Sequence, residues 1–190
     1  MSHSPAAAIA ALEAKFKILK KAEFRGETSL TVEPEQLLEI CSFCRDSLGF
    51  SYLLDIAGLD HFGEDPRFEV VYELYNLERG EWLRIKTPVS EDKLEIASVS
   101  SIWATADWHE REAYDMFGIR FSNHPDLRRI LMWDGYPFYP LRKDFPLAGK
   151  ASNMPDVAFS NAAPLEGGPF VTVPSTATTK DREPRSRSQI

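Results

Sequence analysis

The apolar positions near the start of the chain recur at helical spacing. Within residues 1–21, four of them fall on one side of a helix, which predicts an amphipathic helix rather than a signal peptide. These four are Ile9, Leu12, Phe16 and Leu19. A second helix is expected between Pro34, a residue favoured at helix starts, and Gly49, a residue favoured just after helix ends. Its apolar face consists of Leu37, Cys41, Cys44 and Leu48.

Alternation of apolar and polar residues with a period of two predicts strands. One short strand is expected within residues 22–32, and a half-buried strand at 50–59. The clearest strand of the chain lies at 67–77. A strand at 82–89 is its expected hairpin partner, with the loop at 78–81 between them.

The region after residue 89 has no clear period at first and then a helical pattern. Residues 90–102 fit either a short helix or an irregular link. From Asp107 onward the pattern predicts a helix that ends at Gly118. Asp107 is followed three residues later by Glu110, which is a variant of the capping box with Asp in place of Ser or Thr.

The order of these elements predicts the fold class. It indicates an α+β domain in which a small, mostly antiparallel sheet is covered on one face by helices. We place this domain at residues 1–148. Residues 149–190 are rich in Ala, Pro, Ser, Thr and Gly and lack a periodic apolar pattern. We expect them to form a long extended or disordered C-terminal arm.

Composition and charge narrow the classes of function. The 190-residue chain is 43% hydrophobic, which suffices for one domain with a core. Its net charge of −7 argues against general binding to the phosphates of nucleic acids. No stretch approaches the roughly 20 consecutive apolar residues of a membrane-spanning helix.

Cys41 and Cys44 form a CxxC pair, for which three functional interpretations are open: a redox dithiol, half of a zinc site, or part of an iron–sulfur site. Metal and cluster sites need about four ligands, and none of the four histidines is spaced to complete one. The pair lies in mid-helix, in phase with Leu37 and Leu48. We therefore expect both thiols in the hydrophobic core, with no disulfide.

The helix that begins near Asp107 carries a ladder of charges. Asp107, Arg111 and Asp115 are spaced i, i+4 and i+8, so Arg111 can meet both acids. The spacing fits either a solvated face or a partly buried ionic cluster that organises the following loop. The sequence holds no Gly-rich phosphate loop and no Ser–His–Asp arrangement, so no catalytic, cofactor-binding or metal-binding residue is expected.

Residues 121–146 combine six aromatic residues with four prolines. Such a segment cannot form a regular helix or a central strand. Aromatic and Arg side chains in an irregular, proline-stiffened segment suit a protein interface. The alternative is a loop that folds back on its own domain.

Residues 110–131 resemble, without a gap, the signature of the complex I 30 kDa subunit family, whose bacterial members are known as the C subunits of NADH:quinone oxidoreductase. The matching positions are Glu110, Arg111, Glu112, Asp115, Met116, Phe117, His124, Arg128, Ile130 and Leu131. The close match covers residues 102–148, and the upstream helix and strands agree with the family fold. The short N-terminus lacks an Arg-rich mitochondrial presequence, which favours a bacterial complex.

The resemblance implies a non-redox structural and assembly subunit in the peripheral arm of a proton-translocating NADH:quinone oxidoreductase. The flavin, the iron–sulfur clusters and the quinone would all be bound by partner subunits. The implied partners are the quinone-site subunit related to the hydrogenase large subunit, the subunit with the terminal iron–sulfur cluster, and other peripheral-arm subunits. These would hold the chain on the cytoplasmic side of the inner membrane, and the signature residues would lie near contacts between subunits.

Two alternatives stay open. The sequence does not identify the electron donor, so the chain could be the equivalent subunit of a membrane-bound hydrogenase or of a ferredoxin- or deazaflavin-driven dehydrogenase. From another class, it could be a free-standing thiol-redox protein built on Cys41 and Cys44.

Overall fold

A five-stranded sheet forms the centre of the fold, with the strand order β1-β2-β5-β4-β3. The computed structural model describes residues 5–146, and the arm expected at 149–190 lies outside them. The strands are β1 (Ile18–Phe24), β2 (Glu27–Val32), β3 (Tyr52–Asp60), β4 (Phe68–Asn76) and β5 (Glu81–Val89). All neighbouring strands are antiparallel except β2 and β5, which are parallel. The predicted α+β class with a mostly antiparallel sheet is therefore confirmed.

The single strand expected within residues 22–32 is in fact a hairpin. Strands β1 and β2 are joined by Arg25 and Gly26, both with a positive φ, at 52° and 83°. Two consecutive residues of this kind fit the right-handed twist of a two-residue hairpin. The N-terminal helix α1 (Ala6–Lys15) ends before Leu19, which lies on β1 with 41% of its surface exposed. The expected place of Leu19 on the helical face was therefore wrong.

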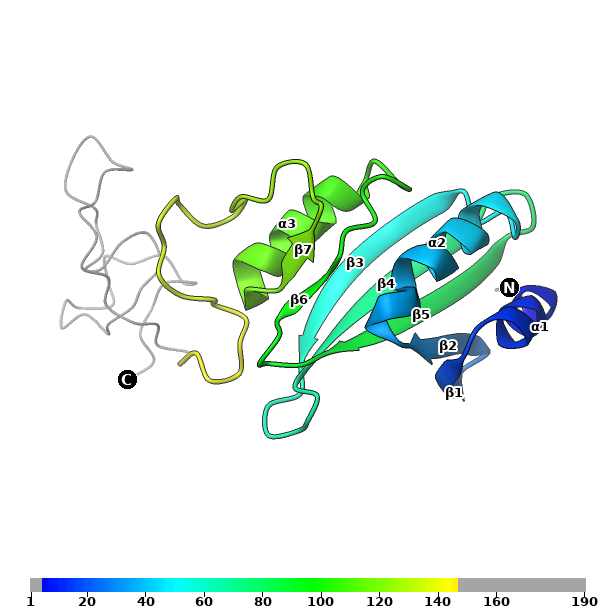
Figure 1. Ribbon diagram of the computed structural model, residues 1–190, viewed down its shortest axis with the longest axis horizontal. Coiled ribbons are helices and arrows are strands. Elements are labelled where there is room, and N and C mark those ends of the chain that lie inside the picture. The colour runs from blue at the N-terminus through cyan, green and yellow to red at the C-terminus, as the bar shows by residue number, and fades with distance from the viewer. Residues whose placement is uncertain (1–4, 147–190) are drawn as a thin grey trace, which may run out of the picture.

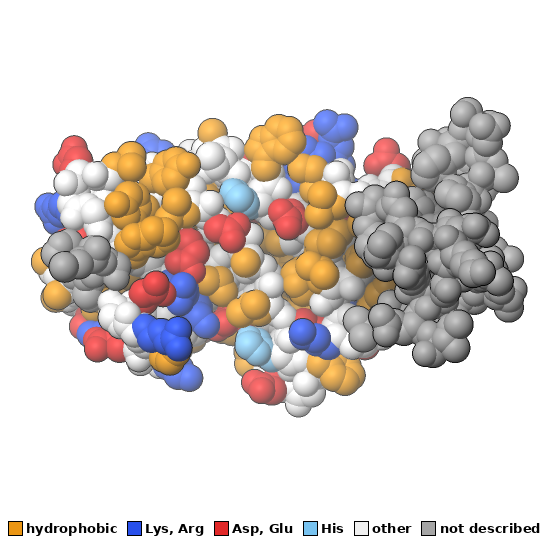
Figure 2. Space-filling model, turned by 180° about the vertical axis from the view of Figure 1, so that it is seen from behind, with side chains coloured by type: hydrophobic (Ala, Val, Ile, Leu, Met, Phe, Trp, Pro, Cys, Tyr) orange, Lys and Arg blue, Asp and Glu red, His pale blue; other side chains and the backbone are white. Residues whose placement is uncertain are grey.

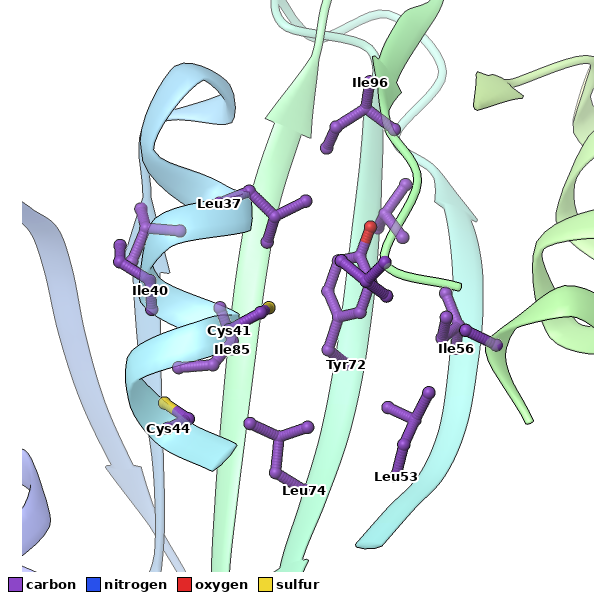
Figure 3. Packing of buried hydrophobic residues seen from close by; sticks show 14 of the residues in the cluster. Leu37, Ile40, Cys41, Cys44, Leu53, Ile56, Tyr72, Leu74, Ile85 and Ile96 are labelled. Atoms are coloured by element: carbon purple, nitrogen blue, oxygen red, sulfur yellow. The ribbon is translucent and has the colours of Figure 1, made fainter. Parts of the chain in front are cut away.

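Helix α2 covers one face of the sheet (Figure 1). A 3-10 turn (Pro34–Gln36) leads into α2 (Leu37–Asp46), as Pro34 predicted. Cys41 and Cys44 are fully buried and form no disulfide, and they lie among the apolar side chains between α2 and the strands (Figure 3). The expected burial of both thiols in the core is confirmed.

The other face of the sheet is more mixed (Figure 2). Its register places Tyr52, Tyr75 and Trp82 in one row across β3, β4 and β5. Farther along the strands, Arg84 pairs with Glu73, and Lys86 pairs with Glu69 at 3.0 Å. Along each strand, side chains on this mixed face alternate with side chains that face the core. This alternation explains why the three strands could be predicted from their period.

Residues 90–102 form neither a helix nor only an irregular link, because they contain β6 (Glu95–Ala97). This short strand pairs in parallel with β7 (Arg120–Ser122), and helix α3 (Ala106–Phe117) connects the two. Helix α3 lies along β3 at the edge of the sheet (Figure 1). None of the helices in residues 5–146 is long and apolar enough to cross a membrane.

The ends of α3 fulfil one expectation and contradict another. Gly118 ends the helix with a φ of 80°, as predicted. The N-cap is Thr105 rather than Asp107, and its side chain makes no capping hydrogen bond. The predicted capping box was wrong because the carboxylate of Glu110 binds elsewhere in the fold.

Candidate functional site

The candidate site consists of α3 and residues 121–146, which fold back over this helix. It contains all ten positions of the family signature, and eight of them were expected near contacts between subunits: Glu110, Arg111, Glu112, Asp115, His124, Arg128, Ile130 and Leu131. Their side chains separate into a group that holds the fold together and a group that faces outward.

Glu110 belongs to the inward group, and its carboxylate is fully buried. It accepts hydrogen bonds from the hydroxyl of Ser98 at 2.6 Å and from the backbone N–H of Val99 at 2.7 Å. The pKa of Glu110 is raised from 4.5 to about 7, chiefly by burial; the two hydrogen bonds oppose this rise, and the nearby Asp107 adds to it. Through these two bonds, the Glu110 side chain holds Ser98 and Val99, which precede α3, against the helix.

The imidazole of His124 is buried beside Glu110. Its Nδ1 accepts the N–H of Asp126 at 3.0 Å, so the ring hydrogen is assigned to Nε2. Nε2 donates to the backbone carbonyl of Asp107 at 3.1 Å and lies 3.9 Å from the carboxylate of Glu110. His124 thus ties the turn after β7 to the first turn of α3.

Asp115 organises the next part of the loop from a fully buried position. One carboxylate oxygen accepts the consecutive backbone N–H groups of residues 130–132 at 3.0, 2.7 and 2.8 Å. The other accepts Nη1 of Arg129 at 2.5 Å. A carboxylate with this many charge-assisted bonds fixes the path of the chain.

Arg111 does not bridge the two acids as its spacing suggested. Its guanidinium donates instead to the backbone carbonyls of Arg128 and Arg129, both at 3.1 Å. Asp115 is paired with Arg129, and Asp107 faces His124. The predicted ladder was therefore wrong in its partners, although its residues do organise the following loop.

The aromatic part of the loop packs on its own domain. Ring contacts link Trp133 to Tyr136, Tyr136 to Phe138 and Phe138 to Phe145, with centroids 4.5, 5.6 and 5.9 Å apart. The backbone N–H of Leu141 donates to the carbonyl of Met116 at 3.2 Å, and Nε of Arg142 donates to that of Phe117 at 2.7 Å. The segment is therefore a loop that folds back on its own domain, which was the alternative to a pure interface segment. Some of its side chains stay exposed.

A buried ionic cluster that the sequence did not predict anchors the far end of the loop. Arg67 binds both carboxylate oxygens of Asp60, at 2.8 and 2.9 Å, and also reaches Asp144 at 2.5 Å. These hydrogen bonds are the main cause of the lowered pKa values of Asp60 and Asp144. No local spacing could reveal the contact, because 77 residues separate Arg67 from Asp144.

The outward group consists of Glu112, Arg128 and Leu131. Leu131 is 54% exposed, and Arg128 is exposed and pairs with the neighbouring Asp126. Within residues 5–146, no cation lies within ion-pair distance of Glu112. Ile130 is half-buried. Beside this group, Trp108 is 63% exposed, with the guanidinium of Arg111 5.7 Å from the centre of its ring.

The two thiols lie apart from this site, in the core under α2. Burial raises the pKa of Cys44 to about 12 and also raises that of Cys41, which disfavours the reactive thiolate. Within the part of the chain that the structure describes, no group of three or more His, Cys, Asp or Glu side chains is placed to hold a metal ion.

Comparisons with known proteins agree on one family. The model of the family described as "Respiratory-chain NADH dehydrogenase, 30 Kd subunit" matches residues 30–151. The chain is 47% identical over 144 residues to the C subunit of the NADH-quinone oxidoreductase of Geotalea uraniireducens, covering 75% of this chain and 88% of that protein. It is 46% identical over 145 residues to the corresponding protein of Geobacter metallireducens, covering 75% and 90%.

Two solved structures share the fold. A trypsin-resistant fragment (1-134) of Nqo5 superposes with a TM-score of 0.57 at 31% identity, covering 64% of this chain and 98% of the fragment. A chain in the structure of the membrane-bound sulfane sulfur reductase, an archaeal respiratory membrane complex, gives a TM-score of 0.64 at 25% identity, covering 75% and 85%.

Proposed function

The chain belongs to the family of the respiratory-chain NADH dehydrogenase 30 Kd subunit, and we propose that it acts as a non-redox structural subunit of a proton-translocating NADH:quinone oxidoreductase. It would support electron transfer from NADH to quinone by bracing the subunits that carry the cofactors. The two bacterial relatives named above, both subunits of an NADH-quinone oxidoreductase, support this assignment.

The observation that carries the proposal is the division of the signature residues. Glu110, Asp115 and His124 are engaged inside the domain, where they hold the loop rigidly on α3. Glu112, Arg128 and Leu131 lie on the outside of the rigid surface that results. A rigid, exposed set of charged and apolar side chains is what a partner protein can bind without a large cost in ordering.

The proposed partners follow from the family. They are the quinone-site subunit related to the hydrogenase large subunit, the subunit with the terminal iron–sulfur cluster, and other subunits of the peripheral arm. Through them the chain would be held on the cytoplasmic side of the bacterial inner membrane. Flavin, iron–sulfur clusters and quinone would be bound by those partners.

The proposal that this chain does no redox chemistry is supported by the state of its thiols. Cys41 and Cys44 are packed among apolar side chains, and burial raises the pKa of both. A thiol-redox protein needs an accessible thiolate, so this environment disfavours that alternative.

A second candidate is the equivalent subunit of a respiratory membrane complex with another electron donor, such as a membrane-bound hydrogenase or a ferredoxin- or deazaflavin-driven dehydrogenase. The shared fold with a chain of the archaeal sulfane sulfur reductase favours it. The higher sequence identity to the NADH-quinone oxidoreductase relatives favours NADH as the electron donor.

Affinity purification of the full chain from gently solubilised membranes tests the proposal and separates the candidates. We expect the NADH-binding flavin subunit and the quinone-site subunit among the co-purifying chains. A hydrogenase or ferredoxin-linked module in place of the flavin subunit would establish the second candidate. Recovery of the chain alone, carrying stoichiometric iron or flavin, would contradict both.

A further inference from the structure

A groove lies between β3 and α3, where the helix runs along the edge of the sheet (Figure 1). It has a cavity volume of about 140 Å³, which is room for one long side chain. Its lining is mainly apolar and includes Ile56, Ala57, Ala113, Met116 and Phe117. Leu141 forms one wall and is 52% exposed. The groove thus offers apolar surface that is open at the rim.

Gly58 keeps β3 and α3 at the separation that forms this groove. A Cβ atom at this position would lie 2.6 Å from the ring of Phe117, which is closer than real Cβ atoms approach. The bare backbone of Gly58 therefore lets the ring rest against β3. The lining of the groove depends on this contact.

Two carboxylates line the groove, and they differ in their surroundings. Asp55 lies 3.1 Å from Nδ1 of His109 on α3. Glu112 lies on the outer side of the same helix, and no Lys, Arg or His within residues 5–146 comes within ion-pair distance of it. The groove therefore combines an apolar lining with a negative charge that the described part of the chain does not neutralise.

Glu112 also lies beside an aromatic side chain of the kind that anchors interfaces. Trp108 stands one helical turn before it, at the i, i+4 spacing that makes the two side chains neighbours. Trp residues are enriched among the energetically dominant contacts of protein interfaces, and Trp108 is 63% exposed. Glu112 thus shares the groove with Leu141 and has Trp108 as its neighbour along the helix.

We propose that this groove binds a segment of a partner subunit in which a Lys or Arg stands next to an apolar side chain. The cation pairs with Glu112, and the apolar side chain enters between Phe117 and Leu141. An acidic segment would leave like charges facing each other in a partly desolvated place, and this repulsion excludes it. This inference rests on the proposed function, because it needs a partner subunit.

Site-specific photo-crosslinking in the assembled complex tests the inference. A benzophenone amino acid replaces Leu141 in the full chain, membranes are irradiated, and the cross-linked peptide is identified by mass spectrometry. We expect a peptide of another subunit that contains Lys or Arg beside an apolar residue. Adding Glu112→Lys should lower the yield of this cross-link about tenfold, as expected for loss of a desolvated charge pair.

The matched control is Glu64→Lys, the same charge change on the exposed turn after β3. It should leave the cross-link unchanged. An acidic or uncharged peptide, an unchanged yield with Glu112→Lys, or no cross-link in a chain that is part of the complex would each overturn the groove assignment alone. A chain that is absent from any complex on a native gel would overturn the proposed function, and this inference with it.

Discussion

Glu110 is a buried carboxylate held by a hydroxyl and a backbone N–H rather than by a cation. Its raised pKa, about 7, means that the folded chain keeps this proton over a range where the unfolded chain has lost it. Since the folded state binds more protons between about pH 4.5 and pH 7, its stability falls as the pH rises through this window. Below about pH 4.5 both states are protonated, and the penalty from this group disappears.

Glu110→Gln should remove this pH dependence, because the amide keeps the shape of the side chain and cannot ionise. We expect the free energy of unfolding of the original chain, relative to the variant, to fall by up to about 3 kcal/mol between pH 5 and pH 8. Urea titrations at pH 5, 6, 7 and 8 measure the difference. Parallel curves for the two chains would show that Glu110 is already ionised in the folded state.

Asp115 has the opposite character, because it is surrounded by donors. Asp115→Asn removes the charge that faces Arg129 and turns one acceptor oxygen into a donor. We expect a loss of about 3–5 kcal/mol in the free energy of unfolding, with faster hydrogen exchange at the amides of residues 130–132. Asp126→Asn is the control, since its ion pair with Arg128 is exposed and should contribute less than about 1 kcal/mol. Equal effects of the two changes would contradict the organising role of Asp115.

Residue spacing predicted which residues matter in the site better than it predicted their partners. The i, i+4 rule brought Arg111 near Asp107 and Asp115, but it considers only one helix. Arg129 approaches Asp115 from the following loop, and backbone carbonyls of the same loop receive Arg111. Which donor reaches which acceptor depends on how the loop folds back, and the linear pattern contains no such information.

Elements with a clear period were predictable, and those without one were not. Strands β4 and β5 alternate over most of their length, and α2 keeps its buried residues on one face. Strands β6 and β7 have three residues each, too few for alternation to be visible. The β1–β2 hairpin had a signal in Gly26, because an isolated glycine inside a strand pattern indicates a turn or a bulge.

The contact between β3 and α3 offers a test at the scale of elements. Gly58→Ala places a methyl group against the ring of Phe117 and should push the helix away from the strand. We expect a loss of about 1–3 kcal/mol in stability, as is typical of overpacking. Adding Phe117→Leu should restore part of it, which a double-mutant cycle by thermal unfolding would detect. Additive effects of the two changes would show that the ring and the glycine are not in contact.

At the scale of the whole molecule, the fold separates two tasks. The sheet and the helices that pack on it supply the core, while the outer side of α3 and its loop supply a surface at the edge of the sheet (Figure 1). The carboxylates and the histidine that hold this surface are bonded inside the domain, so little of their chemistry is available to a substrate. This division fits the structural role that we propose, under which changes of the exposed residues should affect assembly of the complex more than its catalysis.

The most direct test of this account is the rate of quinone reduction per assembled complex after Leu131→Asp. Leu131 is exposed, so the free chain should keep its melting temperature. We predict less intact complex on a native gel and an unchanged NADH:quinone reductase rate for each complex that still forms. A normal amount of complex with a lost rate per complex would contradict the account, because it would place chemistry in this chain.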